Sequence, residues 1–305
     1  MMAGERLSAM RIGLKRVIKT VLGPFGLPMA LLRRPCGPRV LLYHRVNPYD
    51  FADLGPVSRE LRVRPDEFRW QLRHMAHRGF RAVTVQSFQA MISGQVASDP
   101  RAVLITFDDG YEDNLLFAAP ELVAAATPAL LFIATGFLDR QSGDLWTHGD
   151  AAGKGRFLTT AQVSQIAAMG VAIGSHTVSH PRMTTRDDET LAAELAASRI
   201  TLERLTGAPV DSFAYPEGDL DARVEALVRR GGYALAFTTE TGAVGPHPRP
   251  LRLRRTEVSA SDSRLIFALK LSGALDWTRV KDSTRIRRLI QRVNDALLAR
   301  LGTAR

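Results

Sequence analysis

Residues 102–111 read Ala-Val-Leu-Ile-Thr-Phe-Asp-Asp-Gly-Tyr, an apolar run that ends in two adjacent carboxylates. The run 102–107 has the length and character of a buried strand of a parallel sheet. Asp108 and Asp109 therefore follow the carboxyl end of a predicted strand, where α/β proteins carry their functional side chains. Gly110 relieves the turn that comes next, so that both carboxylates can point toward one ion and its water.

A second stretch repeats this arrangement further along the chain. Residues 171–181 read Val-Ala-Ile-Gly-Ser-His-Thr-Val-Ser-His-Pro, an apolar run followed by two histidines. His176 and His180 are four residues apart, which brings both imidazoles to one side of a helical turn or tight loop. One carboxylate and two imidazoles can hold Zn²⁺, Co²⁺ or Ni²⁺ and leave a position open for water. The two stretches predict a metal-dependent hydrolase site; the alternative is a capping pair of aspartates and two surface histidines.

From about residue 38 onward, apolar runs typical of strands alternate with segments typical of helices. Strands are expected over 39–43, 82–85, 102–107, 129–133, 171–174, 212–215, 233–238 and 251–258, and helices over 65–78, 87–92, 114–126, 160–169, 188–205 and 221–230. This alternation favours a parallel sheet, either doubly wound or closed into a barrel. The polar residues follow strands that are far apart in sequence. Because a barrel brings all its strand ends to one rim, the sequence predicts an α/β barrel.

The formal net charge of +10 is concentrated at the two ends of the chain. Residues 1–39 hold eight Lys or Arg and one acid, and residues 249–305 hold fourteen Lys or Arg and five acids. The body, 40–248, holds nineteen basic and twenty-five acidic residues. An acidic body argues against a nucleic-acid partner bound on the folded domain. Basic ends suit an anionic membrane surface or an acidic polymer.

Both basic ends also place apolar residues at helical spacing. Residues 10–22 and 286–297 each combine an apolar stripe with a basic face. Each is therefore predicted to form a helix that lies on an anionic membrane or docks on the domain. No run reaches the roughly 18 apolar residues of a membrane span, and no signal-peptide cleavage site is evident. The expected location is the cytoplasm or the surface of the inner membrane.

The two motifs, Thr-Phe-Asp-Asp-Gly-Tyr at 106–111 and Ser-His-Thr-Val-Ser-His-Pro at 175–181, together resemble the polysaccharide deacetylase family. These are the NodB-homology enzymes of carbohydrate esterase family 4, and the resemblance covers about residues 38–258. It implies a distorted (β/α) barrel of about seven strands that removes N-acetyl groups from sugars with a divalent metal, most often Zn²⁺. The chain then divides into a basic amphipathic segment 1–37, a catalytic domain 38–260 and a basic helical extension 261–305.

The resemblance also implies roles for individual residues. The metal ligands would be Asp109, His176 and His180. Asp108 would be the general base. Many members supply the general acid from a late histidine, but 250–258 contains none. The segment Tyr43–Val46 instead resembles a subgroup with an N-terminal Tyr-His motif, so His44 is the predicted acid; the alternative is a structural histidine.

Residues 211–218 resemble the family's third motif, which lines the substrate groove. Many members have an arginine there that pairs with the base, whereas this chain has Ala214. An aromatic residue usually follows the proline, whereas this chain has Glu217, whose backbone N–H can still donate to an oxyanion. The predicted substrate-binding residues are Tyr111, Trp146, Tyr215, Pro216 and Glu217. For Trp146, stacking on a sugar and packing within its loop are both open.

These features predict a metal-dependent N-deacetylase that acts on an N-acetylated glycan of cell-surface or exopolysaccharide metabolism. Two alternatives stay open. The first keeps the site but changes the substrate to an O-acetyl ester or a non-sugar amide. The second is a catalytically weak glycan-binding module, against which the complete set of metal ligands argues.

Overall fold

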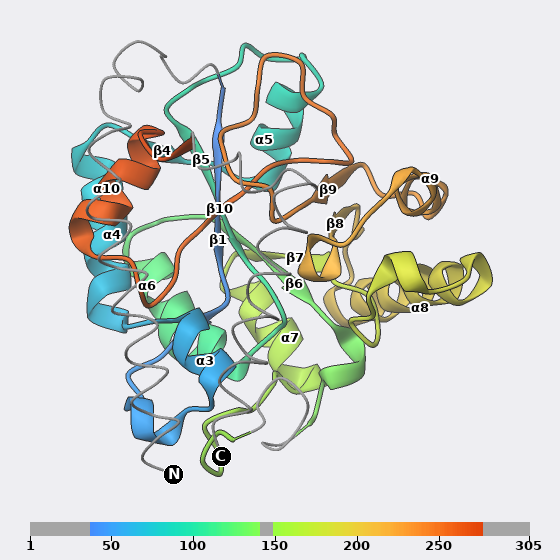
Figure 1. Ribbon diagram of the computed structural model, residues 1–305, viewed down its shortest axis with the longest axis horizontal. Helices are drawn as coiled ribbons and strands as arrows, with labels where there is room; N and C mark the ends of the chain where they lie inside the picture. The colour runs from blue at the N-terminus through green and yellow to red at the C-terminus, as the bar shows by residue number, and fades with distance from the viewer. Residues whose placement is uncertain (1–36, 141–148, 277–305) are drawn as a thin grey trace, which may run out of the picture.

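The computed structural model describes residues 37–140 and 149–276, which fold around one curled parallel sheet (Figure 1). Its strands are β1 (Arg39–Tyr43), β4 (Arg81–Ala82), β5 (Ala102–Phe107), β6 (Ala129–Ile133), β7 (Val171–Ser175), β8 (Ser212–Ala214), β9 (Leu235–Phe237) and β10 (Thr256–Glu257). They lie in the order β10-β1-β5-β6-β7-β8-β9, and β4 pairs with the start of β5. A separate parallel pair joins β2 (Arg45–Val46) to β3 (Arg62–Val63).

The two edges of the sheet are joined by residues 252–257, which we call the seam. Leu253 pairs with β9, since its N–H donates to the Ala236 carbonyl and its carbonyl accepts from the Thr238 N–H, both at 2.8 Å. Thr256 lies in register with Leu41 of β1. One short segment therefore contacts both edges, and the sheet curls into the distorted α/β barrel that the sequence predicts.

Helices surround the sheet (Figure 1). They are α3 (Pro56–Leu61), α4 (Pro65–His77), α5 (Val85–Ile92), α6 (Ala119–Ala124), α7 (Thr160–Ala168), α8 (Asp188–Thr206), α9 (Ala222–Arg230) and α10 (Arg264–Ser272). Local signals fix their ends: α8 begins where the Asp187 carboxylate accepts from the Thr190 N–H at 2.7 Å. It ends at Gly207, whose φ of 67° a glycine adopts without strain. Single helical turns lie at Phe51–Asp53, Asn114–Ala118, Thr135–Phe137, Met183–Thr185 and Pro216–Gly218.

Strand residues are buried on both faces, and alternate residues join different apolar clusters. In β5, Val103, Ile105 and Phe107 belong to the cluster on the outer face, which also contains residues of α4, α6 and α8. Leu104 points the other way and joins a cluster inside the barrel. That inner cluster contains Phe88 of α5 and Leu253 of the seam. Apolar side chains at the inner positions of the strands therefore fill the inside of the sheet, and the candidate site lies at the carboxyl ends of these strands.

The structure corrects three details of the predicted elements. The strand expected over 82–85 ends at Ala82, because the Thr84 hydroxyl caps α5 by accepting from the Ser87 N–H at 3.1 Å. The strand expected over 251–258 is reduced to Thr256–Glu257, and the helix expected over 114–126 divides into a π-helical turn and α6. Helix α3 and the β2–β3 pair were not predicted.

The predicted helices at 10–22 and 286–297, and Trp146, lie outside the described residues, so their membrane and sugar contacts stay predictions. Within the predicted extension 261–305, α10 packs on α4, with the rings of Phe267 and Trp70 6.1 Å apart. Arg264 of α10 also pairs with Glu67 at 3.1 Å. In the described part of the chain, no helix has the length and apolar character needed to cross a membrane.

Candidate active site and metal centre

The three predicted metal ligands lie together at the carboxyl ends of two strands. Asp109 follows β5, and His176 and His180 follow β7. The Asp109 Oδ1 atom lies 3.5 Å from His176 Nε2 and 3.7 Å from His180 Nε2. One ligand atom from each residue falls within 4.8 Å of the other two, and the three side chains are almost fully buried. The group is therefore compact enough to hold one ion.

Three residues in and around this group have left-handed backbone conformations, which set the direction of their side chains. Asp109, Thr177 and His180 have φ values of 78°, 66° and 54°, although none of them is a glycine. Such conformations cost on the order of 1–3 kcal/mol each and persist only where neighbours hold them. In the histidine loop the Thr177 hydroxyl accepts from the His180 N–H at 3.0 Å. The predicted ligands Asp109 and His180 therefore lie in two strained turns, one after β5 and one after β7.

Glu194 of α8 holds the same loop from below. One carboxylate oxygen accepts from the backbone N–H groups of Val178 and Ser179 at 2.7 and 2.8 Å, and the other accepts from the Ser179 hydroxyl at 2.6 Å. This residue was missed in the sequence, where it is one of several acids on a helix. Its position on the helix face that meets the loop gives it its role.

His176 is oriented by the strand beside it. Its Nδ1 lies 2.8 Å from the Ala214 carbonyl, which can only accept, so Nδ1 carries the hydrogen. In the neutral ring the other nitrogen, Nε2, then has a free lone pair on the side of Asp109. Metal-binding histidines commonly show this arrangement, because a hydrogen bond to the remote nitrogen fixes the ring and its tautomer.

Asp108 lies beside the ligand group and is bound by Arg255 of the seam. The two guanidinium nitrogens Nη1 and Nη2 each donate to one carboxylate oxygen at 2.7 Å. Arg255 is 1% exposed, and its Nε donates to the Thr238 carbonyl at 2.9 Å. The sequence suggested that Asp108 lacks the arginine found in many relatives at the position of Ala214. The structure shows that an arginine from a later segment takes that place.

Burial and nearby charges act in opposite directions on the pKa values of the two aspartates. Burial alone would raise the pKa of Asp108, but Arg255 outweighs it and holds that pKa below its usual value. Burial is likewise outweighed at Asp109, whose pKa is lowered by its close contact with His176 and by the nearby His44 and His180. Burial, with the nearby His176, lowers the pKa of His180 to about 4. His180 is therefore neutral near pH 7, the form that binds a metal.

His44 lies on the same rim as the two aspartates. The Asp108 N–H donates to the Tyr43 carbonyl at 3.0 Å, and Tyr43 is in register with Phe107, so His44 follows its strand level with Asp108. His44 contributes to the low pKa of both Asp108 and Asp109. Its Nδ1 atom is buried and has no hydrogen-bond partner among residues 37–140 and 149–276.

The predicted substrate-binding residues fall into two groups. Glu217 is half-exposed at the rim, 3.6 Å from Arg182, and its backbone has a φ of 53°. Tyr111, Tyr215 and Pro216 are buried, and their contact with a substrate stays a prediction. The Tyr111 ring stacks on Phe157 at 4.8 Å between centroids, and the Tyr215 hydroxyl donates to the Leu251 carbonyl at 2.8 Å.

Arg45, which follows His44, anchors the surroundings of the site. Its guanidinium lies 4.6 Å from the centre of the Tyr111 ring and is 1% exposed. It donates to Asp113 and Asp150 at 2.7 Å each, and the Asp150 side chain is fully buried. This buried group ties the segment after β1 to the turn that carries Asp109. Nothing local in the sequence distinguishes Arg45 from the other arginines.

Comparison with known proteins agrees with this geometry. Residues 95–236 match the family described as polysaccharide deacetylase. YxkH of Bacillus subtilis, whose name places it among the polysaccharide deacetylases, is 25% identical over 234 residues, or 77% of this chain and 76% of YxkH. The family resemblance predicted from the two motifs is therefore confirmed. The match does not extend to the Tyr-His subgroup, which stays a prediction.

Two solved structures show the same fold. The deacetylase PplD of Streptococcus pyogenes, solved with acetate, superposes with a TM-score of 0.66 at 22% identity, over 78% of this chain and 99% of PplD. IcaB of Ammonifex degensii superposes with a TM-score of 0.65 at 23% identity, over 79% of this chain and 98% of IcaB. At these identities the likeness establishes the fold.

Proposed function

We propose that this chain, which carries a polysaccharide deacetylase domain, is a metal-dependent hydrolase that removes N-acetyl groups from a glycan. One observation carries the proposal: a compact Asp-His-His group lies beside a second carboxylate that has its own arginine. The first group can bind an ion, and the second carboxylate is left for proton transfer. A glycan-binding module would have no use for this pair of arrangements.

The three ligand residues fit a zinc ion. Bonds of about 2.0–2.1 Å in a tetrahedron place ligand atoms about 3.3 Å apart. The atom pairs Asp109–His176 and Asp109–His180 are separated by 3.5 and 3.7 Å, close to that spacing. When bound there, Zn²⁺ acts as a Lewis acid and lowers the pKa of water from about 15.7 to about 7. The same donors accept Co²⁺ or Ni²⁺.

In the proposed reaction Asp108 accepts the proton of the attacking water. Its low pKa keeps it ionised near pH 7, and Arg255 holds both of its oxygens in one orientation. The Glu217 backbone N–H donates to the oxygen of the former acetyl carbonyl as negative charge develops on it. His44 then protonates the departing sugar nitrogen, so that acetate and a free amine are released.

Acetate release from N-acetylglucosamine oligomers tests this proposal. The protein is first treated with a chelator and then supplied with Zn²⁺, and wild type is compared with Asp108→Asn. We expect Zn²⁺-dependent release that falls by about 10²–10⁴ in the variant, the usual contribution of a general base. Asp99→Asn, which alters a partly exposed ion pair with Arg81, is the matched control.

The assay also separates the alternatives. Release from O-acetylated sugars but from no N-acetylated oligomer would assign the site to ester hydrolysis. Absence of bound metal after Zn²⁺ addition, measured by atomic absorption, would contradict the enzyme proposal and favour a binding module.

A further inference from the structure

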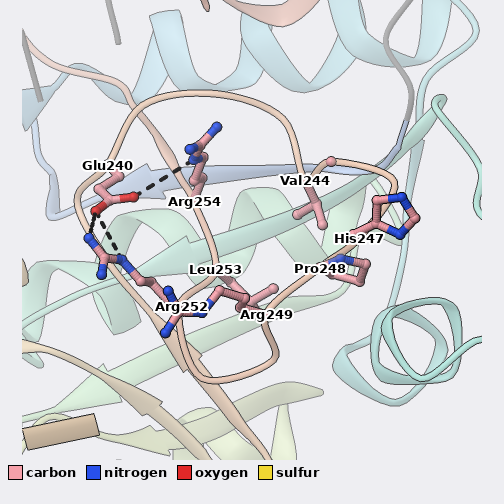
Figure 2. Close-up of a pocket in the computed structure, with 9 residues that line it drawn as sticks. Glu240, Val244, His247, Pro248, Arg249, Arg252, Leu253 and Arg254 are labelled. Atoms are coloured by element: carbon pink, nitrogen blue, oxygen red, sulfur yellow. Dashed lines mark hydrogen bonds and ion pairs between the residues drawn. The ribbon is translucent and has the colours of Figure 1, made fainter. Parts of the chain in front are cut away.

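A basic pocket lies on the outer face of the seam, where the loop after β9 returns to the barrel (Figure 2). It encloses about 390 Å³, which is within the usual range for small-ligand sites. Its polar lining consists of Glu240, His247, Arg249, Arg252 and Arg254. None of these residues belongs to the catalytic group. The seam separates the two, since Arg255 is buried toward Asp108 while Arg252 and Arg254 are 37% and 42% exposed.

One carboxylate in this pocket holds two guanidinium groups side by side. Arg252 donates to Glu240 Oε1 from Nε at 3.1 Å and from Nη2 at 2.5 Å. Arg254 approaches Glu240 Oε2 at 3.7 Å, and its side chain donates no hydrogen bond to residues 37–140 or 149–276. Figure 2 shows Glu240 between the two arginines. The carboxylate orders both cations but neutralises only one, which lowers the entropic cost of binding an anion there.

An adjoining hollow repeats the pattern. It shares Arg249 with the first pocket and contains Arg229. Both arginines contact a single carboxylate, Glu225, at 2.7 and 3.6 Å. Across the two hollows four arginines face two carboxylates, which leaves a surplus of two positive charges. Each arginine presents five N–H donors in a planar fork, and most of these donors remain available.

We propose that this surface, the outer arginine pocket, binds a phosphate group. Phosphate carries about −1.5 to −2 charges near pH 7, which matches the surplus, and its tetrahedral oxygens accept bidentate bonds from guanidinium groups. The pocket also begins next to the rim of the site. Thr239, which precedes Glu240, places its hydroxyl 3.4 Å from the Glu217 carbonyl. On the proposed function, the ligand is therefore the phosphate of a phosphate-bearing glycan whose acetylated sugar lies at the rim.

Titration calorimetry with inorganic pyrophosphate tests the pocket without requiring activity. Full-length wild type is compared with the double variant Arg252→Gln/Arg254→Gln, and Arg249→Gln is a second variant that leaves the seam intact. The control is Arg64→Gln/Arg81→Gln, which removes two exposed arginines that also pair with aspartates. We expect pyrophosphate affinity to fall at least tenfold in the double variant and severalfold in Arg249→Gln, but to be unchanged in the control.

Absent binding to wild type, or equal loss in the control, would overturn the proposal. Flotation with phosphatidylglycerol vesicles distinguishes the source of the phosphate: vesicle binding that depends on Arg252 and Arg254, without pyrophosphate binding, would assign the surface to a lipid headgroup and contradict a glycan ligand. If pyrophosphate binds as expected but no substrate releases acetate, the pocket stands and the proposed function fails.

Discussion

Asp108 and Asp109 are adjacent in sequence and both are buried, yet their surroundings differ. Asp108 receives two hydrogen bonds of 2.7 Å from Arg255, so the chain itself supplies its counter-charge. Asp109 faces two histidines, and within residues 37–140 and 149–276 no Lys or Arg forms an ion pair with it. A buried carboxylate without a fixed cation is costly. On the proposed function, Arg255 balances the charge of Asp108, and a metal ion would balance the charge of Asp109.

The largest effect is expected when the carboxylate of the proposed ligand Asp109 is removed. Asp109→Asn keeps the shape but weakens the metal group, so we expect loss of bound zinc. Metal ions supply several kcal/mol of transition-state stabilisation, and each 1.36 kcal/mol is tenfold in rate, so activity should fall by about 10³ or more. Zinc content and acetate release are measured on the same sample. A variant that keeps one equivalent of zinc and full activity would show that Asp109 is not a ligand.

The second test breaks the protein-supplied pair. Arg255→Met leaves Asp108 buried without its cation, and removing one partner of a buried ion pair costs about 3–5 kcal/mol. We expect that loss in urea unfolding, together with a fall of about 10–100-fold in kcat/KM, while zinc still binds. Arg255→Lys restores the charge but not the two-point contact, so it should recover part of both losses.

Arg254→Met is the matched control for the stability part of that experiment, because it changes the adjacent residue, which lies on the opposite face of the seam. Its side chain is 42% exposed, and substitutions at such positions usually change stability by less than about 0.5 kcal/mol. Similar losses of stability in Arg254→Met and Arg255→Met would mean that the ion pair between Arg255 and Asp108 does not stabilise the protein more than an exposed arginine does.

The comparison also explains which parts of the site the sequence could reveal. Asp108 and His176 directly follow apolar strands, and the other two predicted ligands, Asp109 and His180, come shortly after them, so short local patterns identify all four. Arg255 meets Asp108 across 147 positions of sequence, through the way the seam closes the sheet. The pattern of residues 252–255 is compatible with a strand that points Leu253 and Arg255 inward. It does not indicate which residue Arg255 contacts. The barrel was predictable because strand and helix signals repeat, whereas the register between its two edges is a tertiary property.

The burial of Tyr111 could not be predicted from the sequence for a related reason. Tyr111 lies in a motif next to the ligands, and its position suggests contact with the substrate. In the fold, Phe157 and Arg45 cover its ring. Both come from distant segments, and no local pattern links them to Tyr111. A prediction of exposure needs the partners of a side chain, which only the packed structure supplies.

A third test measures how much zinc binding stabilises the folded protein. Zinc that binds only the folded state stabilises it by about 2.7 kcal/mol when its concentration is 100 times the dissociation constant. We therefore expect the melting temperature to fall after chelation and to recover when Zn²⁺ is added. Asp109→Asn should show no recovery, whereas Arg255→Met should recover as wild type does. Recovery in both variants would remove the distinction between the two carboxylates.

The smallest expected effect concerns the loop that carries the histidines. Glu194→Ala removes the acceptor of three hydrogen bonds that hold residues 178 and 179, but it touches no ligand. Groups that orient metal ligands typically change metal affinity by about 10–100-fold. We expect the zinc dissociation constant to rise by about tenfold, with kcat at saturating zinc within about twofold of wild type. Glu189→Ala, an exposed acid on the same helix, should leave both values unchanged. A loss of kcat that excess zinc does not restore would instead mean that Glu194 also affects the general base Asp108. The surroundings of Asp108 and Asp109 would then not be independent of each other.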